Sequence, residues 1–359
     1  MNRDKAYTAM KDKLEGIVKD GRTNTTRMLK RIEAEWSQRR DIIVRSNAMD
    51  FGLDLHGNFA IMAGGEHLTP TNHAYGQLLS RAHVPPRYAE ELMKLGLNEL
   101  LRTNLRTLLP VVSPGGILVR HVGPVAKGIL SSSYKRMDAS PVFQSYVEHS
   151  VKAGLVPYRS TVTDTRYTVS FLDQRIHRFG LHEFVVFGTE LCTGDYGGVA
   201  AVYGLMALRI VCINLSVGFN VFRSIHLGRR FELSEDDSDI IEISRKTVEY
   251  DTKALVSAVG DAVNSTDRLL TQLAEKVEAA NNSEPELKEI LAKLKTKGFK
   301  KDVVDKVRET YESDALPYEV LPQERTAWRL SNAISFLARS AEGDDKHELE
   351  RAAMSVLAA

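Results

Sequence analysis

The stretch GGILVRHVGPVAKGILSSSYKRMDASPVFQSYVEHSVKAG, residues 115–154, places two strand-like segments directly before a helix-like one. GGILVRHVG and VAKGILSSS are rich in β-branched and large apolar residues, which favour strands. SPVFQSYVEHSVKAG has the character of a helix, and Asp138 or Ser140 is suited to cap its start. Two neighbouring strands followed by a helix predict an α+β fold with mostly antiparallel pairing.

Similar segments continue in both directions from this stretch. DIIV (41–44) reads as a short strand, and MDFGLDLHGNFAIMA (49–63) as a hairpin that turns at residues 56–58. Thr69 or Thr71 can cap a helix over TNHAYGQLLSRA, and Pro85-Pro86 suits the start of the next one. NELLRTNLRTLLP (98–110) reads as a third helix. Further strands are expected in RYTVSFLD (166–173), EFVVFGTELCTG (183–194) and residues 199–223.

The two ends of the chain have a different character from this core. Residues 3–20 and 23–39 read as two helices, with Gly21 as the C-cap between them. After Phe231 the sequence is acidic and helix-periodic, as in DTKALVSAVGDAVNSTDRLLTQLAEKV. We therefore expect an N-terminal helical hairpin (1–40), a mixed, basic α/β core (41–231) and an acidic helical region (232–359). A central, mostly antiparallel sheet would be flanked by helices.

Charge is distributed unevenly along a chain of almost neutral total charge. Residues 1–231 contain 30 Lys or Arg against 20 Asp or Glu, whereas residues 232–359 contain 18 against 27. A basic N-terminal part is suited to a polyanionic partner, although the two parts could also simply attract each other. The two cysteines have no metal-type spacing, and neither a signal peptide nor a membrane-length apolar run is evident. We therefore expect a cytoplasmic protein without a membrane partner.

Motifs for familiar catalytic chemistry are missing from the sequence. GPVAKG (123–128) resembles part of a phosphate loop, but neither GxxxxGK[ST] nor GxGxxG occurs, and no GxSxG elbow surrounds the serines at 131–133. The histidines lack metal-ligand spacing. We expect no enzyme activity, cofactor or metal site. An unrecognised enzyme would use His121, Ser133, Tyr134 and Asp138.

The strongest functional pattern is the repeated pairing of cations with aromatic residues or histidines in the basic part. Tyr134-Lys135-Arg136 and Arg166-Tyr167 are examples. Single-stranded nucleic acid is bound by this mixture, because cations follow phosphates while flat rings stack on bases. Each pair could equally be a core ring beside a solvated cation. The residues that we predict to bind nucleic acid are Arg120, Lys127, Tyr134, Lys135, Arg136, Arg166, Arg223, Arg229 and Arg230.

Four blocks of sequence, taken in order, resemble a known family. They are LTPTNHAYGQLLSRAHVPPRYAEEL (68–92), GILSSSYKRMDASPVF (128–143), ALRIVCINLSV with SIHLGRR (207–230) and TAWRLSNAIS (326–335). Together they resemble the phage/plasmid-like protein family built on a domain of unknown function. Ser132-Ser133 stand where that family usually has an acidic residue, and Asn214-Leu215 where it has Asn-Gly. The resemblance implies a mobile-element protein of a bacterial cell and assigns no activity to any residue.

These observations favour a non-enzymatic nucleic-acid-binding protein of a phage or plasmid. It would prefer single-stranded DNA to duplex and act in replication, annealing, recombination or transcription. The alternative is a phage interaction protein that modulates a host or phage enzyme through its acidic helical region, residues 232–359. A replication or transcription protein of phage or host could be a further partner, and homo-oligomerisation is left open.

Overall fold

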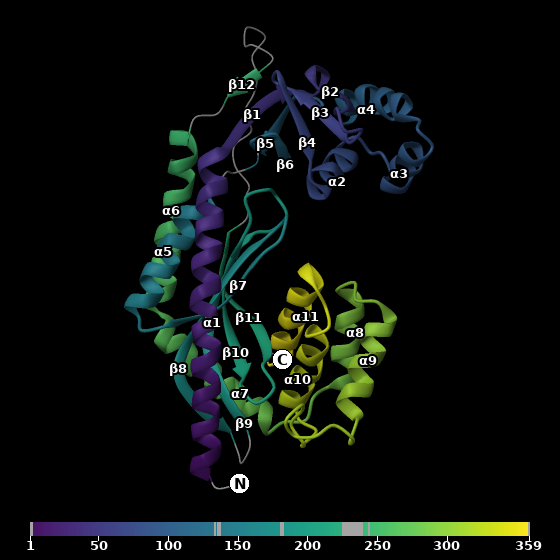
Figure 1. The fold of residues 1–359 in the computed structure, drawn as a ribbon. Helices are drawn as coiled ribbons and strands as arrows, with labels where there is room; N and C mark the ends of the chain where they lie inside the picture. Colours follow the sequence, from purple (N-terminus) through teal and green to yellow (C-terminus); the bar gives the residue numbers. More distant parts are fainter. Residues whose placement is uncertain are drawn as a thin grey trace.

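The computed structural model describes residues 3–132, 134, 138–179, 183–224, 240–242 and 245–357. Within these ranges, only the backbone is described for residues 3–4, 219–224, 240–242, 245–251 and 344. Two mostly antiparallel sheets and a helical C-terminal region make up the fold, which confirms the α+β prediction. The expected single sheet is divided in two, and the long helix α1 (Arg3–Gln38) runs beside the second sheet (Figure 1).

The first sheet has seven strands in the order β12-β1-β5-β6-β4-β3-β2, antiparallel except where β4 meets β6. The predicted hairpin around residues 56–58 is confirmed, because Leu53 pairs with Phe59 on either side of the turn. The strands are β1 (Arg39–Arg45), β2 (Asp50–Leu53), β3 (Phe59–Ala63), β4 (Glu66–Pro70), β5 (Gly116–Val122), β6 (Val125–Ser131) and β12 (Ile240–Glu242). A strand from the region expected to be helical thus completes one edge of this sheet.

Three helices cover the first sheet: α2 (Asn72–Arg81), α3 (Pro86–Lys94) and α4 (Asn98–Val112). Thr71 caps α2 as predicted, since its hydroxyl accepts a hydrogen bond from the backbone N–H of Ala74 at 3.2 Å. Leu78 and Leu105 contribute to a buried apolar core that joins these helices to β1–β6. A short 3-10 helix, η1 (Ser46–Ala48), follows β1.

The second sheet is antiparallel, with five strands in the order β11-β10-β9-β8-β7. Its strands are β7 (Val156–Val162), β8 (Tyr167–Phe179), β9 (Glu183–Thr193), β10 (Ala201–Arg209) and β11 (Asn214–Ser224). Every residue of β9 and β10 is buried, as expected for strands with their β-branched and aromatic composition. The predicted strand segments 166–173, 183–194 and 199–223 all fall in this sheet.

Helices pack on the second sheet from several sides (Figure 1). Tyr146 of α5 (Ala139–Lys152) meets Phe171 of β8 edge to face at 5.2 Å. Trp328 of α10 (Ala327–Ala338) lies in a separate buried cluster with Phe187 of β9. The remaining helices are α6 (Arg245–Asn264), α7 (Thr266–Asn281), α8 (Leu287–Thr296), α9 (Lys301–Glu312) and α11 (Gly343–Val356). No helix among the described residues is long and apolar enough to cross a membrane.

The expected break at Gly21 was wrong, because α1 continues through it as a single helix. A Cβ atom at Gly21 would lie 2.4 Å from the Pro157 carbonyl oxygen of β7 and 2.5 Å from that of Tyr158. The glycine therefore allows the helix to approach the strand closely instead of ending the helix. The expected N-terminal hairpin, residues 1–40, is one long helix followed by the first residues of β1.

Candidate nucleic-acid interface

Arg120, the first of the predicted nucleic-acid contacts, lies in the protein interior. Its side chain is fully buried, and its guanidinium group donates to both carboxylate oxygens of Asp41 at 2.7 Å. A third hydrogen bond reaches the Asp195 carbonyl oxygen at 2.9 Å. A phosphate cannot approach a guanidinium group that is enclosed and paired in this way. Arg120 is therefore corrected from a binding residue to a structural one.

Arg120 belongs to an ion network that ties the two sheets and α5 together. Arg39 of β1 donates to Asp195 at 2.8 Å and is also ion-paired with Asp138. The other Asp195 oxygen accepts from the backbone N–H of Ala139, where α5 begins, at 2.9 Å. Burial raises the pKa of Asp195, while Arg39 and Arg120 act to lower it. Buried charges need such mutual pairing, so these residues are committed to the fold.

The start of α5 differs from the expected capping arrangement. Asp138 precedes the helix, but its side chain makes no capping hydrogen bond. Instead, its carboxylate accepts from the indole N–H of Trp36 at 2.8 Å. Ser140 lies inside the helix and is buried. Asp138 therefore anchors α1 to α5, and the capping role predicted for Asp138 or Ser140 is wrong.

Lys127, Tyr134 and Arg166 also contact polar groups of the protein itself. The Lys127 ammonium lies 3.5 Å from both Glu35 oxygens, and its side chain is 15% exposed. Tyr134 is buried and donates to the Gly194 carbonyl at 3.4 Å. The Arg166 guanidinium lies 3.5 Å from the Glu348 carboxylate. Each side chain therefore has a structural role, and phosphate contacts would compete with these partners.

The other residues of that prediction cannot be placed in a site. Lys135, Arg136, Arg229 and Arg230 lie outside the described residues, as does Ser133. Arg223 lies in β11, where only the backbone is described. The described residues of the alternative enzyme hypothesis do not form a hydrogen-bonded catalytic arrangement. His121 Nδ1 lies 2.8 Å from the Gly123 carbonyl oxygen, and no hydrogen bond joins its ring to Tyr134 or Asp138 within the described ranges.

A recess of about 740 Å³ lies where the first sheet meets the ends of its helices. We call it the Arg45–Arg81 recess. Its wall comes from segments far apart in the chain: the end of β1 with η1, the end of α2, Pro110 with residues 112–117, and Ser131-Ser132 at the end of β6. The Ser46 N–H donates to the Gly115 carbonyl at 3.0 Å, which holds two of these segments together. Gly115 has φ of +103°, a conformation that favours glycine.

Arg45 and Arg81 are the charged side chains among the described residues of this wall, and neither Asp nor Glu lines it. Arg81 is half-buried and donates from Nε to the Ile129 carbonyl at 2.9 Å. Burial lowers the pKa of Arg81, and no carboxylate of a described residue acts to raise it again. The guanidinium group stays charged, since arginine titrates far above neutral pH. The recess is therefore a partly desolvated cationic site with no acidic residue on its described wall.

Hydroxyl groups complete the polar character of the recess. Ser131 and Ser132 of the SSSYKR segment line it, together with Ser46 and Ser113. The Ser113 hydroxyl donates to the Arg81 carbonyl at 3.1 Å, which fixes the end of α2 against the end of α4. Ser131 and Ser132, which no catalytic motif explained, thus form part of a cationic recess.

A shallower hollow of about 440 Å³ continues from Arg81 along α2. Asn72, His73, Gln77 and Ser80 line it, and its described wall again contains no acidic residue. His73 and Gln77 both contact the Tyr196 carbonyl oxygen at 2.9 Å, so these side chains are held in place. The two hollows share Arg81, and no acidic residue lines the described part of either.

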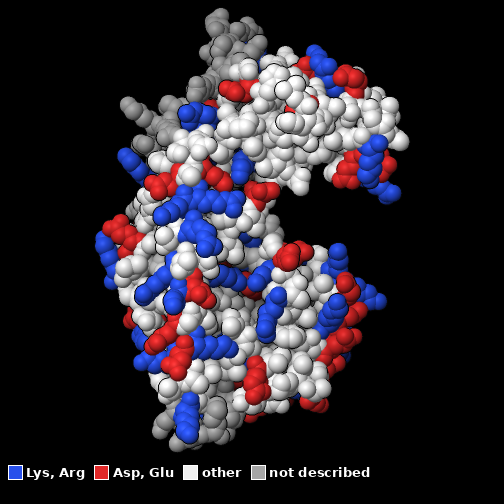
Figure 2. All heavy atoms as spheres, viewed as in Figure 1, with Lys and Arg blue, Asp and Glu red and all other residues white. Residues whose placement is uncertain are grey.

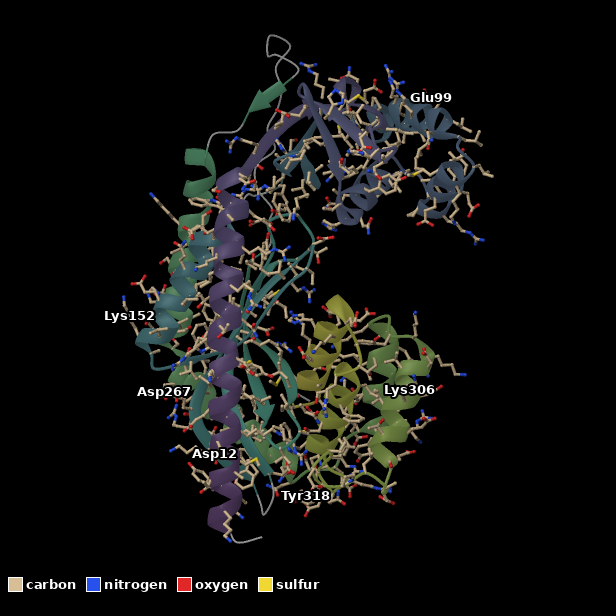
Figure 3. All side chains as sticks on the ribbon, viewed as in Figure 1. Asp12, Glu99, Lys152, Asp267, Lys306 and Tyr318 are labelled. Atoms are coloured by element: carbon tan, nitrogen blue, oxygen red, sulfur yellow. The ribbon has the colours of Figure 1, made fainter. Side chains whose placement is uncertain are left out.

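Another pocket, of about 530 Å³, lies between the ends of α5 and α7 and has a different charge pattern. Lys152 and Asp267, both labelled in Figure 3, contribute opposite charges to it. Its Arg175 bonds to Asp173 at 2.6 Å and to Asp267 at 2.5 Å. Because carboxylates already neutralise the arginine, this pocket is poorly suited to an anion.

Sequence reasoning missed Arg45 and Arg81 because neither belongs to a cluster. They are 36 positions apart, and neither stands beside an aromatic residue. Only the pairing of β1 with β5 and the position of α2 beside β6 bring them to one recess. Ser131 and Ser132, expected from the sequence to be strand or turn residues, also line this recess.

Comparison of the chain with protein-family models, curated proteins and solved structures finds no match. The resemblance to the phage/plasmid-like family therefore stays a prediction.

Proposed function

We propose that the protein binds nucleic acid, that it prefers single-stranded DNA to duplex, and that the Arg45–Arg81 recess holds a phosphate of the strand. The observation that carries the proposal is the convergence of two arginines and several serine hydroxyls on a wall with no described acidic residue. Guanidinium groups bind phosphate through paired, charge-assisted hydrogen bonds. Partial burial strengthens such bonds, because water competes less for the charges.

The shape of the site favours a single strand. A recess of about 740 Å³ can take one phosphate and part of its nucleotide, as ligand pockets of this size do. In a single strand the backbone can bend into the recess and the nucleotide can turn with it. In a duplex each nucleotide is held by pairing and stacking, so taking it into a recess costs unstacking energy. Preference for single strands is expected to come from this difference.

Stacking by the predicted aromatic residues does not contribute to the proposal. Tyr134 and Tyr167 are buried and bond to groups inside the protein. The expected mechanism is therefore backbone binding, with an affinity that falls as salt rises because bound cations displace counterions from the phosphates. The resemblance to a phage/plasmid-like family supports a setting in replication, recombination or transcription of a mobile element.

The test is an equilibrium titration of a labelled oligonucleotide, single-stranded and duplex, at two salt concentrations. Arg81→Gln is expected to weaken single-strand binding about 10- to 100-fold, the usual effect of losing a charge-assisted hydrogen bond. Asn47→Glu places a negative charge at an exposed position on the same wall and should weaken binding without disturbing the core.

The matched control is Arg87→Gln. Arg87 is an exposed arginine of α3, which also covers the first sheet, and it has no ion pair with a described residue. It removes one positive charge outside the recess and should change the affinity little. Equal losses for Arg81→Gln and Arg87→Gln would reject the recess as the site. If the wild-type protein fails to bind at low salt, the function is rejected, and docking through residues 232–359 becomes the better hypothesis.

A further inference from the structure

The second half of α1 presents a strongly basic surface to solvent. Figure 2 shows Lys and Arg side chains gathered along the upper half of this helix. The exposed acidic residues nearby are Asp20 and Glu33. The exposed cations between residues 19 and 31 are Lys19, Arg22, Arg27, Lys30 and Arg31, and we call them the α1 basic face.

Most of these cations have no carboxylate partner among the described residues. Lys19, Arg22, Arg27 and Lys30 form no ion pair with any residue that the structure describes. Arg31 is the exception, because its Nε lies 3.2 Å from Glu35 one turn along the helix.

Three other helices of the protein contain a charge pair within the helix. Lys94 pairs with Glu91 on α3 at 3.3 Å, and Lys152 with Glu148 on α5 at 2.6 Å. Lys293 pairs with Glu289 on α8 at 2.7 Å. Such pairs stabilise helices, and α1 largely lacks them in its second half.

The packing of α1 against the protein does not require its exposed face to be cationic. Val18, Met28 and Ile32 bury the opposite face of the helix, so the exposed positions need only be polar. In the first half of the helix acids and bases alternate, as with Asp12, labelled in Figure 3, and its neighbours Lys11 and Lys13. Between residues 21 and 31 the exposed charges are all positive.

The length of the α1 basic face suits a nucleic-acid backbone. The twelve steps from Lys19 to Arg31 correspond to about 18 Å at the helical rise of about 1.5 Å per residue. Along one strand of a duplex, phosphates follow each other about every 3.4 Å of axis, so about five phosphates span that length. The five cations of the face match this number.

We propose that the α1 basic face binds the phosphate backbone of a second nucleic-acid segment, without reading its sequence. The inference rests on the nucleic-acid-binding function proposed above but not on the recess. β1 leads from the end of α1 into the first sheet and ends at Arg45 (Figure 1). At about 3.3 Å per residue the strand is roughly 20 Å long, so the two sites are separate. One molecule would hold a single strand in the recess and a second backbone along α1.

An anionic membrane surface fits this face less well. Helices that lie on membranes insert an apolar face between the lipids. The apolar face of α1 is buried against the protein, where Met28 and Ile32 pack with α5 and the second sheet. The exposed arc between residues 19 and 31 offers charge and hydroxyl groups but no large apolar side chain.

The decisive variant is the triple substitution Arg22→Gln, Arg27→Gln and Lys30→Gln. Its matched control is Lys301→Gln, Lys306→Gln and Arg308→Gln on α9, three exposed cations without a described ion pair. Figure 3 labels Lys306 on the far side of the molecule from α1. Both variants change the net charge equally, so a general charge effect would appear in both.

The first readout is duplex binding as a function of salt concentration. The slope of log K against log salt is about −0.9 for each phosphate contact, so the α1 variant should lose about 2.7 from its slope. Its duplex affinity at low salt should fall about tenfold or more, while the α9 variant should match the wild type. An unchanged slope and affinity in the α1 variant would overturn the inference.

The second readout is fluorescence transfer between a donor-labelled single strand and an acceptor-labelled duplex of unrelated sequence. The wild-type protein should bring the two together. The α1 variant should abolish the transfer but keep single-strand binding, whereas Asn47→Glu should lose the single strand and keep the duplex. If Asn47→Glu by itself loses both the single strand and the duplex, the two ligands share the recess. That result would leave the recess proposal standing and reject a second site.

Vesicles of phosphatidylserine and phosphatidylcholine test the competing partner. Binding to these vesicles that the α1 variant loses, together with duplex binding that it keeps, would overturn the inference in favour of a membrane surface.

Discussion

Glu190 of β9 is buried in a charged cluster where α11 packs on the second sheet, and Glu190→Gln tests the cost of that burial. Glu190 accepts a hydrogen bond from the Ser170 hydroxyl at 2.8 Å. The Arg159 guanidinium lies 3.6 Å away but is bonded at 2.6 Å to each oxygen of Glu350. Burial raises the pKa of Glu190 to about 7, with Arg159 opposing the rise and Glu350 adding to it.

The sign of the pH dependence follows from this raised pKa. In the unfolded chain Glu190 loses its proton near its ordinary pKa of 4.5, whereas the folded protein holds the proton until about pH 7. Protonation of Glu190 makes its whole contribution to the free energy of unfolding below pH 4.5, and this contribution is lost as pH rises to about 7. Between pH 5 and pH 8 the loss is about 2.5 kcal/mol, at about 1.36 kcal/mol for each pKa unit.

Glu190→Gln removes this titration and keeps the shape of the side chain. The wild type and the variant should have similar free energies of unfolding at pH 5, and the variant should be more stable by about 2.5 kcal/mol at pH 8. Urea unfolding followed by circular dichroism at the two pH values measures the difference. Titrating groups remote from Glu190 are common to both proteins, so they cancel in the comparison. A stability difference that stays constant between pH 5 and pH 8 would contradict the raised pKa of Glu190.

Three further substitutions test the fold by urea unfolding. Gly21→Ala should destabilise the protein by about 1–3 kcal/mol although alanine favours helices, because its Cβ would meet the Pro157 carbonyl; a gain in stability would contradict this. Arg120→Gln should cost about 3–5 kcal/mol, since it removes the guanidinium group that pairs with buried Asp41, and a loss below 1 kcal/mol would count against it. Thr71→Ala should cost about 1 kcal/mol, because α2 loses its N-cap. Thr69→Ala is the comparison variant, since Thr69 does not cap α2.

Local signals in the sequence predicted much of the fold. Thr71 as a cap, Pro85-Pro86 at the start of α3 and the strands after residue 166 are confirmed, because caps, prolines and β-branched runs act over a few residues. Gly21 misled because a glycine that ends a helix and one that admits a neighbouring strand look alike in sequence. The distinction depends on Pro157, which is far along the chain.

The site was harder to predict for the same reason. Arg120 stands in the apolar run ILVRHV, which forms a strand with apolar residues on both faces. Such a strand can bury its arginine as well, because the carboxylate of Asp41 lies opposite on the neighbouring strand. Arg45 and Arg81 converge only through tertiary packing. Spacing along the chain shows neither pairing partners nor the depth of a recess, and both properties decide whether a cation can bind phosphate.

Binding of a single strand in the Arg45–Arg81 recess is tested by the affinity of a single-stranded oligonucleotide for wild type, Arg81→Gln and Arg87→Gln at low salt. Arg81→Gln should weaken single-strand binding about 10- to 100-fold, while Arg87→Gln should stay close to wild type. Single-strand binding of unchanged affinity in Arg81→Gln would contradict binding in the recess.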